Sequence, residues 1–276
     1  MKVALLQTTA SDDPAENLVA ARAMLAEAEA AGADLALTPE VTNCISLSRD
    51  HQRAVLRPEA GDPMLAALRG EARARGLWIL IGSLALRTAD PAGRFANRSV
   101  LIGADGAIRA RYDKIHMFDV AVSETETYRE SDGYRPGGRA TVADTPWGRL
   151  GLTICYDLRF PHLYRALARA GAAFLAVPSA FSPETGAAHW ETLLRARAIE
   201  TGAYVLAPAQ TGTHAARAGR VRRTHGHSMV VSPWGEVLLD AGTAPGVHVV
   251  EIDPAAVARA RARVPAIHAD RAWEGP

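Results

Sequence analysis

Three ionisable side chains stand where apolar runs of the sequence end. Glu40 closes the run ADLALTPE, Lys114 closes ARYDK, and Cys155 follows LGLTI. Each marks a point where a buried strand would leave the core, and strand ends are where α/β proteins usually place their chemistry. If the three strands are neighbours, a carboxylate, an ammonium and a thiol meet in one pocket.

Such a trio suits the hydrolysis of an amide or a nitrile through a thioester. A thiol at its ordinary pKa of about 8.5 is mostly protonated at neutral pH, so it needs a base. We expect Glu40 to take the thiol proton, to protonate the leaving ammonia and then to activate water. Lys114 and the backbone N–H of Tyr156 would hold the oxyanion. We also expect a dry site to raise the pKa of Glu40, with Lys114 opposing that shift.

Other interpretations fit the same residues. A cysteine that ends an apolar run is more often a core residue, because free cysteine is among the most buried residue types. As a separate alternative, the chain could keep the fold and serve as a binding or scaffold protein. A thiolate beside a lysine is also oxidisable, so Cys155 as a redox sensor is a further hypothesis.

The chain alternates strand-like and helix-like segments. Residues 3–8 predict a strand, and residues 15–31 predict a helix with one apolar stripe, closed by Gly32. A second helix is expected over 62–75, with Asp62 as N-cap and Pro63 at its first position. Strands follow at 77–86, 95–103 and 107–114, the last two joined by a hairpin at 104–106.

After an irregular stretch from 117 to 138, strands and helices alternate again, and antiparallel strands and a final helix from Pro254 complete the pattern. The strands are almost continuously apolar, which indicates sheets covered by helices, and so a layered α/β protein. No linker divides residues 1–276, so we expect a single domain.

Composition narrows the setting. The chain is 48% hydrophobic and 22% charged with a formal net charge of +1, which favours a globular protein and gives no reason to expect a nucleic-acid or membrane partner. Two cysteines make no disulfide framework, and no signal peptide or membrane-spanning run is evident. We therefore expect a cytoplasmic protein whose partner is a small molecule.

No metal or other cofactor is expected. His214, His225 and His227 have no carboxylate or cysteine at ligand spacing, and no glycine-rich phosphate loop is present. The basic run 216–226 reads as a solvated loop or as an anion-attracting rim beside the pocket. Cys44 reads as structural, and His116 as a brace for the segment that carries Lys114.

Several segments together resemble a known family. They are, in chain order, LTPE, YDKIHMFDV, YRES, LGLTICYDLRFPHLYR, AHWETLLRARAIE and GHSMVVSPWGEV. With these the sequence resembles the nitrilase superfamily of carbon–nitrogen hydrolases, and its Nit-type branch, over nearly the whole chain. The resemblance implies that Glu40 is the general base, Lys114 the oxyanion-stabilising residue and Cys155 the nucleophile. It also implies that Glu130, in YRES, positions the lysine and the substrate amine.

The fold implied by this resemblance is a four-layer α-β-β-α sandwich. Members usually pair through the helices next to the nucleophile into an eight-layer dimer, so a homodimer is expected. Two segments depart from the family pattern. The C-terminal VPAIHADRAWEGP differs from the tail that reaches across the dimer, and the loop 120–127 lacks the usual Pro-Gly turn. We expect that loop to shape the pocket mouth.

The resemblance also suggests a substrate class. Arg159 stands where related carbamoylases have an arginine that grips a substrate carboxylate; alternatively it pairs with Asp157 or a neighbouring glutamate. The expected substrate is a small amide that bears a carboxylate. Within the branch, the sequences of these segments favour deaminated glutathione as the substrate. Its hydrolysis would give a 2-oxo acid and a dipeptide. The alternatives are α-ketoglutaramate, cleaved by an ω-amidase with release of ammonia, or another aliphatic amide, a nitrile or an N-carbamoyl compound.

Overall fold

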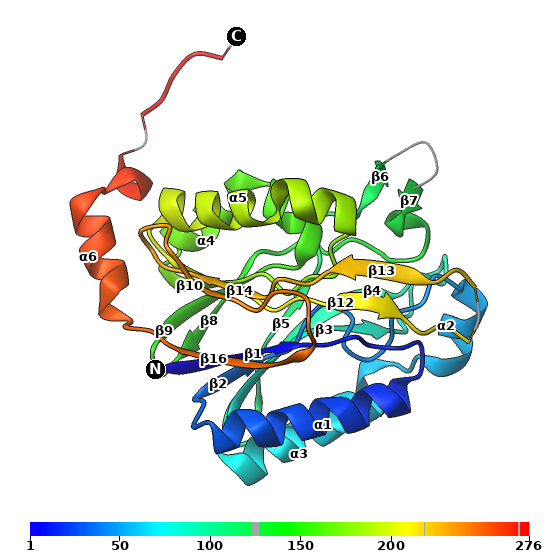
Figure 1. Cartoon of the computed structure of the whole chain (residues 1–276). Coiled ribbons are helices and arrows are strands. Elements are labelled where there is room, and N and C mark those ends of the chain that lie inside the picture. Colours follow the sequence, from blue (N-terminus) through cyan, green and yellow to red (C-terminus); the bar gives the residue numbers. More distant parts are fainter. Residues whose placement is uncertain (123–126, 218, 270, 276) are drawn as a thin grey trace.

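The computed structural model describes residues 1–122, 127–217, 219–269 and 271–275. Two six-stranded sheets lie face to face, and helices cover the outer face of each (Figure 1). Helices α1 (Pro14–Ala30) and α3 (Pro63–Arg75) lie on one side, and α4 (Pro161–Arg169) and α5 (Pro183–Thr201) on the other. This arrangement confirms the predicted α-β-β-α sandwich.

The first sheet is built mainly from the N-terminal half of the chain. In spatial order its strands are β16 (Gly246–Glu251), β1 (Lys2–Gln7), β2 (Leu35–Leu37), β3 (Trp78–Leu86), β4 (Ala96–Ile102) and β5 (Ile108–Asp113). The inner strands β1, β2 and β3 are parallel, and the others pair antiparallel.

The second sheet comes from the C-terminal half. Its order is β15 (Val237–Asp240), β14 (Met229–Val231), β11 (Tyr204–Ala207), β10 (Ala172–Ala176), β9 (Gly148–Leu152) and β8 (Thr141–Thr145). Strands β9, β10 and β11 are parallel. Each sheet thus has a parallel centre whose carboxyl ends carry loops toward the same region.

Shorter elements surround these layers. The remaining helices are α2 (Arg49–Val55) and α6 (Ala255–Arg263), with 3-10 turns η1 (Glu59–Gly61), η2 (Glu130–Asp132), η3 (Cys155–Arg159) and η4 (Ala266–His268). Two small hairpins pair β6 (Asp119–Ala121) with β7 (Thr127–Arg129) and β12 (Thr211–His214) with β13 (Arg222–His225). Among the described residues, no helix is long and apolar enough to cross a membrane.

Strand β1 shows how side chains divide between two cores. Val3 and Leu5 face the other sheet, while Ala4 and Leu6 face the core under α1 and α3. This follows from the two-residue period of a strand, which sends successive side chains to opposite faces. Burying each large aliphatic side chain contributes about 1.5–3 kcal/mol, so both faces of the sheet stabilise the sandwich.

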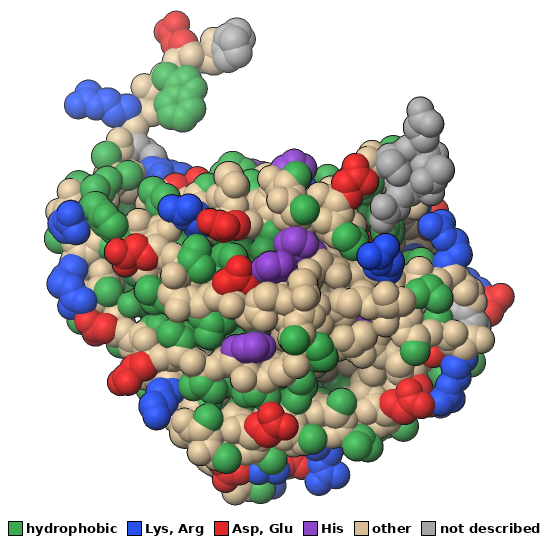
Figure 2. All heavy atoms as spheres, in the orientation of Figure 1, with side chains coloured by type: hydrophobic (Ala, Val, Ile, Leu, Met, Phe, Trp, Pro, Cys, Tyr) green, Lys and Arg blue, Asp and Glu red, His purple; other side chains and the backbone are tan. Residues whose placement is uncertain are grey.

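Most predicted elements are present. Asp62 caps α3 by accepting a hydrogen bond from the N–H of Leu65 at 2.8 Å, and β4 and β5 form the predicted hairpin. Helix α2 and the strands β8 and β12 had no prediction. The hairpin β6–β7 and the strand β13 correct the expected irregular stretch 117–138 and the expected loop 216–226, because short polar segments give little periodicity. Both charge signs are interspersed over the face in Figure 2, as the composition indicated.

Gly82, in β3, lies against the segment that follows β2 and the segment that follows β10. A Cβ atom there would lie 1.9 Å from the carbonyl oxygen of Thr38 and 2.5 Å from Cβ of Pro178. The Gly82 N–H also donates to Oγ1 of Thr38 at 3.0 Å. Only glycine therefore allows the segment that leads to Glu40 to lie against β3 and the end of β10.

We predict that Gly82→Ala lowers the melting temperature by about 2–10 °C, because overpacking of a core costs about 1–3 kcal/mol. Thermal unfolding followed by circular dichroism measures the shift. Gly70→Ala is the matched control: a Cβ at Gly70, inside α3, meets nothing within 4 Å, so that variant should be as stable as the parent or slightly more stable. Equal melting temperatures for both variants would contradict the proposed close contact.

Candidate active site

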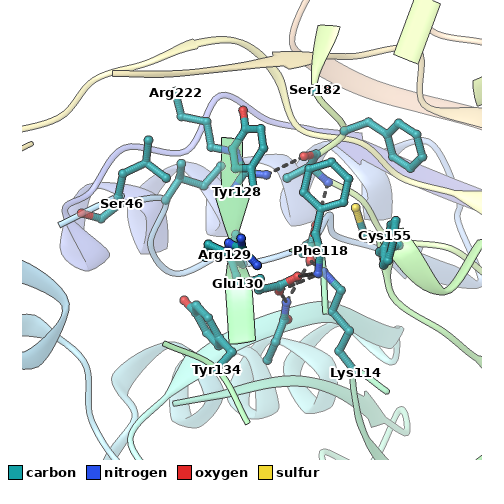
Figure 3. A pocket seen from close by; sticks show the side chains of 18 of the residues that line it. Ser46, Lys114, Phe118, Tyr128, Arg129, Glu130, Tyr134, Cys155, Ser182 and Arg222 are labelled. Carbon is teal, nitrogen blue, oxygen red and sulfur yellow. Dashed lines mark hydrogen bonds and ion pairs between the residues drawn. The ribbon is translucent and has the colours of Figure 1, made fainter. Parts of the chain in front are cut away.

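A cavity of about 270 Å³ lies where loops from both sheets meet (Figure 3). Glu40, Lys114, Glu130, Cys155 and Tyr156 all line it. Glu40 follows β2 and Lys114 follows β5 in the first sheet, whereas Cys155 follows β9 in the second. The structure therefore brings together the trio that the sequence singled out.

Lys114 lies between two carboxylates. Its Nζ is 2.8 Å from Oε1 of Glu40, and 2.9 and 2.8 Å from the two oxygens of Glu130. Only 2% of its side chain is exposed. Burial alone would lower the pKa of Lys114, but Glu130 and Glu40 outweigh it and hold that pKa well above its ordinary value. The lysine is therefore a fixed positive charge.

Glu40 is held on both oxygens. Oε2 accepts the backbone N–H of Ala180 at 2.9 Å, and Oε1 accepts Nδ2 of Asn97 at 2.8 Å. Burial would raise the pKa of Glu40, yet Lys114 and then Arg222 lower it below the ordinary 4.5. The expectation of a raised pKa was wrong, because the cations outweigh the desolvation. Glu40 is therefore an ionised base at neutral pH.

Asn97 is a site residue that the sequence reasoning missed. From the second position of β4 its amide donates to Glu40, and at 3.4 Å to Oε1 of Glu130. It is 2% exposed. A buried asparagine in the otherwise apolar run ANRSVLI was the available signal, since buried polar groups need partners.

Glu130 connects the lysine to the β6–β7 hairpin. Its Oε2 accepts the backbone N–H of Phe118 at 2.7 Å, while both oxygens contact Nζ of Lys114. Glu130 thus fixes where the ammonium points, in keeping with the positioning role that the resemblance implied. Its approach to the substrate amine stays a prediction.

Cys155 begins η3 in a strained conformation. Its φ is +50°, which a non-glycine residue rarely adopts, and its N–H donates to the carbonyl of Pro178 at 3.0 Å. Burial and Glu40 raise the pKa of the thiol, while Lys114 opposes them. The thiol and the Glu40 carboxylate are close enough for each to shift the pKa of the other. The resting pair is therefore a neutral thiol beside a carboxylate, and the proton moves as the sulfur attacks.

The backbone N–H of Tyr156 lies one residue before the first N–H that donates within the turn η3. The first bond of that turn runs from the N–H of Asp157 to the carbonyl of Ile154, at 3.1 Å. The Tyr156 amide thus sits at a helix start, where N–H groups lack a partner within the helix. This is the place an oxyanion donor needs, although the role itself stays a prediction.

Asp157 ties the lysine segment to the cysteine turn. The fully buried carboxylate accepts the hydroxyl of Tyr112 at 2.6 Å, the N–H of Ile154 at 2.9 Å and the N–H of His116 at 3.0 Å. Nδ1 of His116 lies 2.7 Å from it, and the imidazole stacks on Phe160. One carboxylate therefore sets the relative position of Lys114 and Cys155.

Arg159 lies outside the cavity lining. Its Nη2 is 3.2 Å from Nδ1 of His189, and its guanidinium lies over the rings of Tyr156 and Phe181, 5.9 and 5.6 Å from their centres. It contacts His189 rather than Asp157, and its binding of a substrate carboxylate stays a prediction. Four other arginines line the cavity: Arg49, Arg129, Arg220 and Arg222.

Two of these arginines come from the basic run 216–226, so that run contributes to the pocket. Of the loop 120–127, residues 123–126 lie outside the described residues, while the flanking Phe118, Thr127 and Tyr128 line the cavity. Cys44 also lines it, buried, with its thiol 3.5 Å from the carbonyl of Asp12. Its position beside the site adds apolar surface.

The histidines near β13 contact each other. His225 and His227 stack with ring centres 4.6 Å apart, and Nδ1 of His227 lies 2.9 Å from Asp240. His214 bonds to the carbonyl of Ala10 and to Thr224. Within the part of the chain that the structure describes, no three His, Cys, Asp or Glu side chains form a group that could hold a metal.

Comparisons with known proteins find similar sequences over nearly the whole chain. The carbon-nitrogen hydrolase family profile matches residues 2–262. A protein of Yersinia enterocolitica named deaminated glutathione amidase is 40% identical over 270 residues, covering 98% of this chain and 92% of its own length.

Two solved structures are similar to this chain over nearly its whole length. The NitFhit protein of Caenorhabditis elegans has a TM-score of 0.89 and 37% identity, covering 98% of this chain but 65% of that longer chain. Nit3 of Saccharomyces cerevisiae, a member of branch 10 of the nitrilase superfamily, has a TM-score of 0.82 and 29% identity, covering 96% of this chain and 94% of that one.

The directions of the three pKa shifts predict that kcat/KM changes little with pH around neutrality. Glu40 must be ionised to act, and its pKa is lowered below 4.5, while those of Cys155 and Lys114 are raised. We expect kcat/KM for an uncharged amide to be level from about pH 5.5 to 8.5 and to fall only in more acidic solution. A rate that instead rises with pH through an inflection near neutrality would indicate that the thiolate is the reactive form.

We predict that Asp157→Asn lowers kcat about 10- to 100-fold, because the lysine and cysteine segments lose their common acceptor and misalign. Stability should also fall by about 1–3 kcal/mol, since buried donors lose their partner. Steady-state kinetics and thermal unfolding measure both. Asp253→Asn, which removes an exposed carboxylate paired with Arg259, should change neither. An unaltered kcat in Asp157→Asn would show that the alignment does not depend on this carboxylate.

Proposed function

The chain belongs to the carbon–nitrogen hydrolase family, and from this premise we propose that it hydrolyses deaminated glutathione through a thioester on Cys155. It is a hydrolase acting on carbon–nitrogen bonds other than peptide bonds, in linear amides. The observation that carries the proposed mechanism is the meeting of Glu40, Lys114 and Cys155 in one cavity.

In the proposed reaction the sulfur of Cys155 attacks the amide carbon as its proton passes to Glu40. The carbonyl oxygen becomes an oxyanion held by Lys114 and the Tyr156 N–H; one such donor is worth about 3–4 kcal/mol. The C–N bond then breaks, and Glu40 gives its proton to the departing amine.

Deacylation reverses these roles. Glu40 takes a proton from water, whose oxygen attacks the thioester carbon, and the C–S bond breaks to release the acid. The proton returns to the sulfur. Asn97 and Ala180 keep the Glu40 carboxylate in one position through both halves, which suits a group that transfers protons in both directions.

The substrate proposal rests on charge and on relatives. Four arginines line the cavity, whereas its lining carboxylates, Glu40 and Glu130, both contact Lys114. An amide that bears carboxylates complements this surface. Deaminated glutathione bears two, and α-ketoglutaramate, the alternative, bears one. Relatives from Yersinia enterocolitica and Homo sapiens, each 40% identical, are named deaminated glutathione amidases.

The raised pKa of Cys155 argues against the redox-sensor hypothesis. Oxidation proceeds through the thiolate, and burial together with Glu40 keeps this sulfur protonated. A scaffold would not need an ionised base and a thiol in one buried cavity. The amidase therefore uses features that the other two hypotheses leave unexplained.

We further propose a cytoplasmic homodimer that binds a small molecule and neither nucleic acid nor membrane. Free Cys44 and Cys155 suit a reducing compartment. Helices α4 and α5, which the resemblance assigns to pairing, lie on the outside of the second sheet and are free to meet a second copy. Analytical ultracentrifugation tests the homodimer, and a monomer at micromolar concentration would contradict that oligomeric state.

The test is product release from deaminated glutathione, α-ketoglutaramate and an aliphatic nitrile by the purified protein. We expect deaminated glutathione to have the highest kcat/KM, and Cys155→Ala to remove all turnover while keeping the melting temperature. Higher kcat/KM for α-ketoglutaramate would assign the ω-amidase activity instead. Turnover that persists in Cys155→Ala would refute the thioester mechanism.

A further inference from the structure

Arg222 differs from the other arginines that line the cavity. It is the first residue of β13, and its Nη2 donates to the carbonyl of Ala180 at 2.7 Å. Its Nε is buried and has no hydrogen-bond partner among the described residues. A buried guanidinium N–H without an acceptor costs free energy, so this one calls for an explanation.

The remaining lining arginines do not share this property. Arg49 donates to Gln52 at 2.8 Å and lies over the ring of Tyr134, while Arg129 and Arg220 are exposed to water. The acidic residues of the lining do not serve Arg222 either, since Glu40 and Glu130 both contact Lys114. Within the described lining, Arg222 therefore has a buried donor that the chain itself leaves unmatched.

We propose that Arg222 binds a carboxylate of the substrate and so determines the preference for carboxylate-bearing over neutral amides. This rests on the proposed amidase function and narrows its substrate class. A carboxylate accepts from Nε–H and a neighbouring Nη–H together, which is the geometry a guanidinium favours. In Figure 3, Arg222 and Tyr128 lie across the cavity from Cys155, so a ligand can contact both sides.

The same arginine is linked to the general base through one residue. The carbonyl of Ala180 accepts Nη2 of Arg222, and the N–H of Ala180 donates to Oε2 of Glu40. Glu40 is also faced by Lys114, Cys155 and, through Lys114, Glu130. A substrate carboxylate that neutralises Arg222 would weaken its pull on Glu40, so binding of the correct substrate makes the base stronger.

Arg222→Gln tests the proposal with two pairs of probes. Glutaramate and pentanamide differ by a carboxylate on the acyl part; deaminated glutathione and its C-terminal carboxamide differ by one on the leaving group. We expect kcat/KM for the more acidic member of at least one pair to fall about 10- to 100-fold, with the less acidic member within about threefold. The pair that responds identifies the carboxylate bound.

Arg223→Gln is the matched control. Arg223 is the next residue of β13 and is exposed, and successive strand residues face opposite ways, so this variant removes the same charge outside the cavity. It should keep the substrate preference. Equal losses for both members of both pairs in Arg222→Gln would overturn the proposal, as would loss of the preference in Arg159→Gln alone.

Two further readouts separate binding from a structural effect. Calorimetric titration with glutarate should give about tenfold weaker binding to Cys155→Ala/Arg222→Gln than to Cys155→Ala, and equal affinities would overturn the proposal. The acid limb of kcat/KM for pentanamide should move to higher pH in Arg222→Gln, because Glu40 loses a cation that lowers its pKa. A wild-type protein without Cys155-dependent turnover would refute the proposed function itself, whereas glutarate binding would still test Arg222.

Discussion

The buried ammonium of Lys114, enclosed by Glu40 and Glu130, is the interaction on which the rest of the site depends. One positive and two negative charges lie almost out of water, and such a group is stable only when its remaining hydrogen bonds are satisfied. Backbone N–H groups of Ala180 and Phe118 and the amide of Asn97 meet that requirement. Burial and the charge of Glu40 keep the neighbouring thiol neutral, so proton transfer accompanies attack.

This charge cluster exists only when the two sheets are packed together. Glu40, Asn97 and Lys114 come from the first sheet, and Cys155 and Ala180 come from loops of the second. Gly82 permits the close contact between the two parts, and Asp157 joins the lysine segment to the cysteine turn. Since no sheet carries the trio alone, the shared apolar core positions the chemistry as much as the polar contacts do.

The sequence alone located the strands and the site residues where one physical signal dominated. Apolar runs located the strands, and their ends located Glu40, Lys114 and Cys155, while Glu130 came from family resemblance alone. Asn97 and Arg222 escaped because a single polar residue in a strand and an arginine in a basic run look ordinary without the fold. The direction of the Glu40 pKa shift was wrong because it depends on how closely Lys114 and Arg222 approach, and spacing along the chain does not encode that distance.

Two of the three non-glycine residues with positive φ among those described lie beside this chemistry: Cys155 at +50° and Val41, directly after Glu40, at +48°. Valine is poorly suited to that conformation, so glycine at position 41 would relieve strain, but it would also loosen the carboxylate. Engineering programmes that select for thermostability alone would therefore be drawn to position 41, where gains in heat resistance come at the expense of turnover.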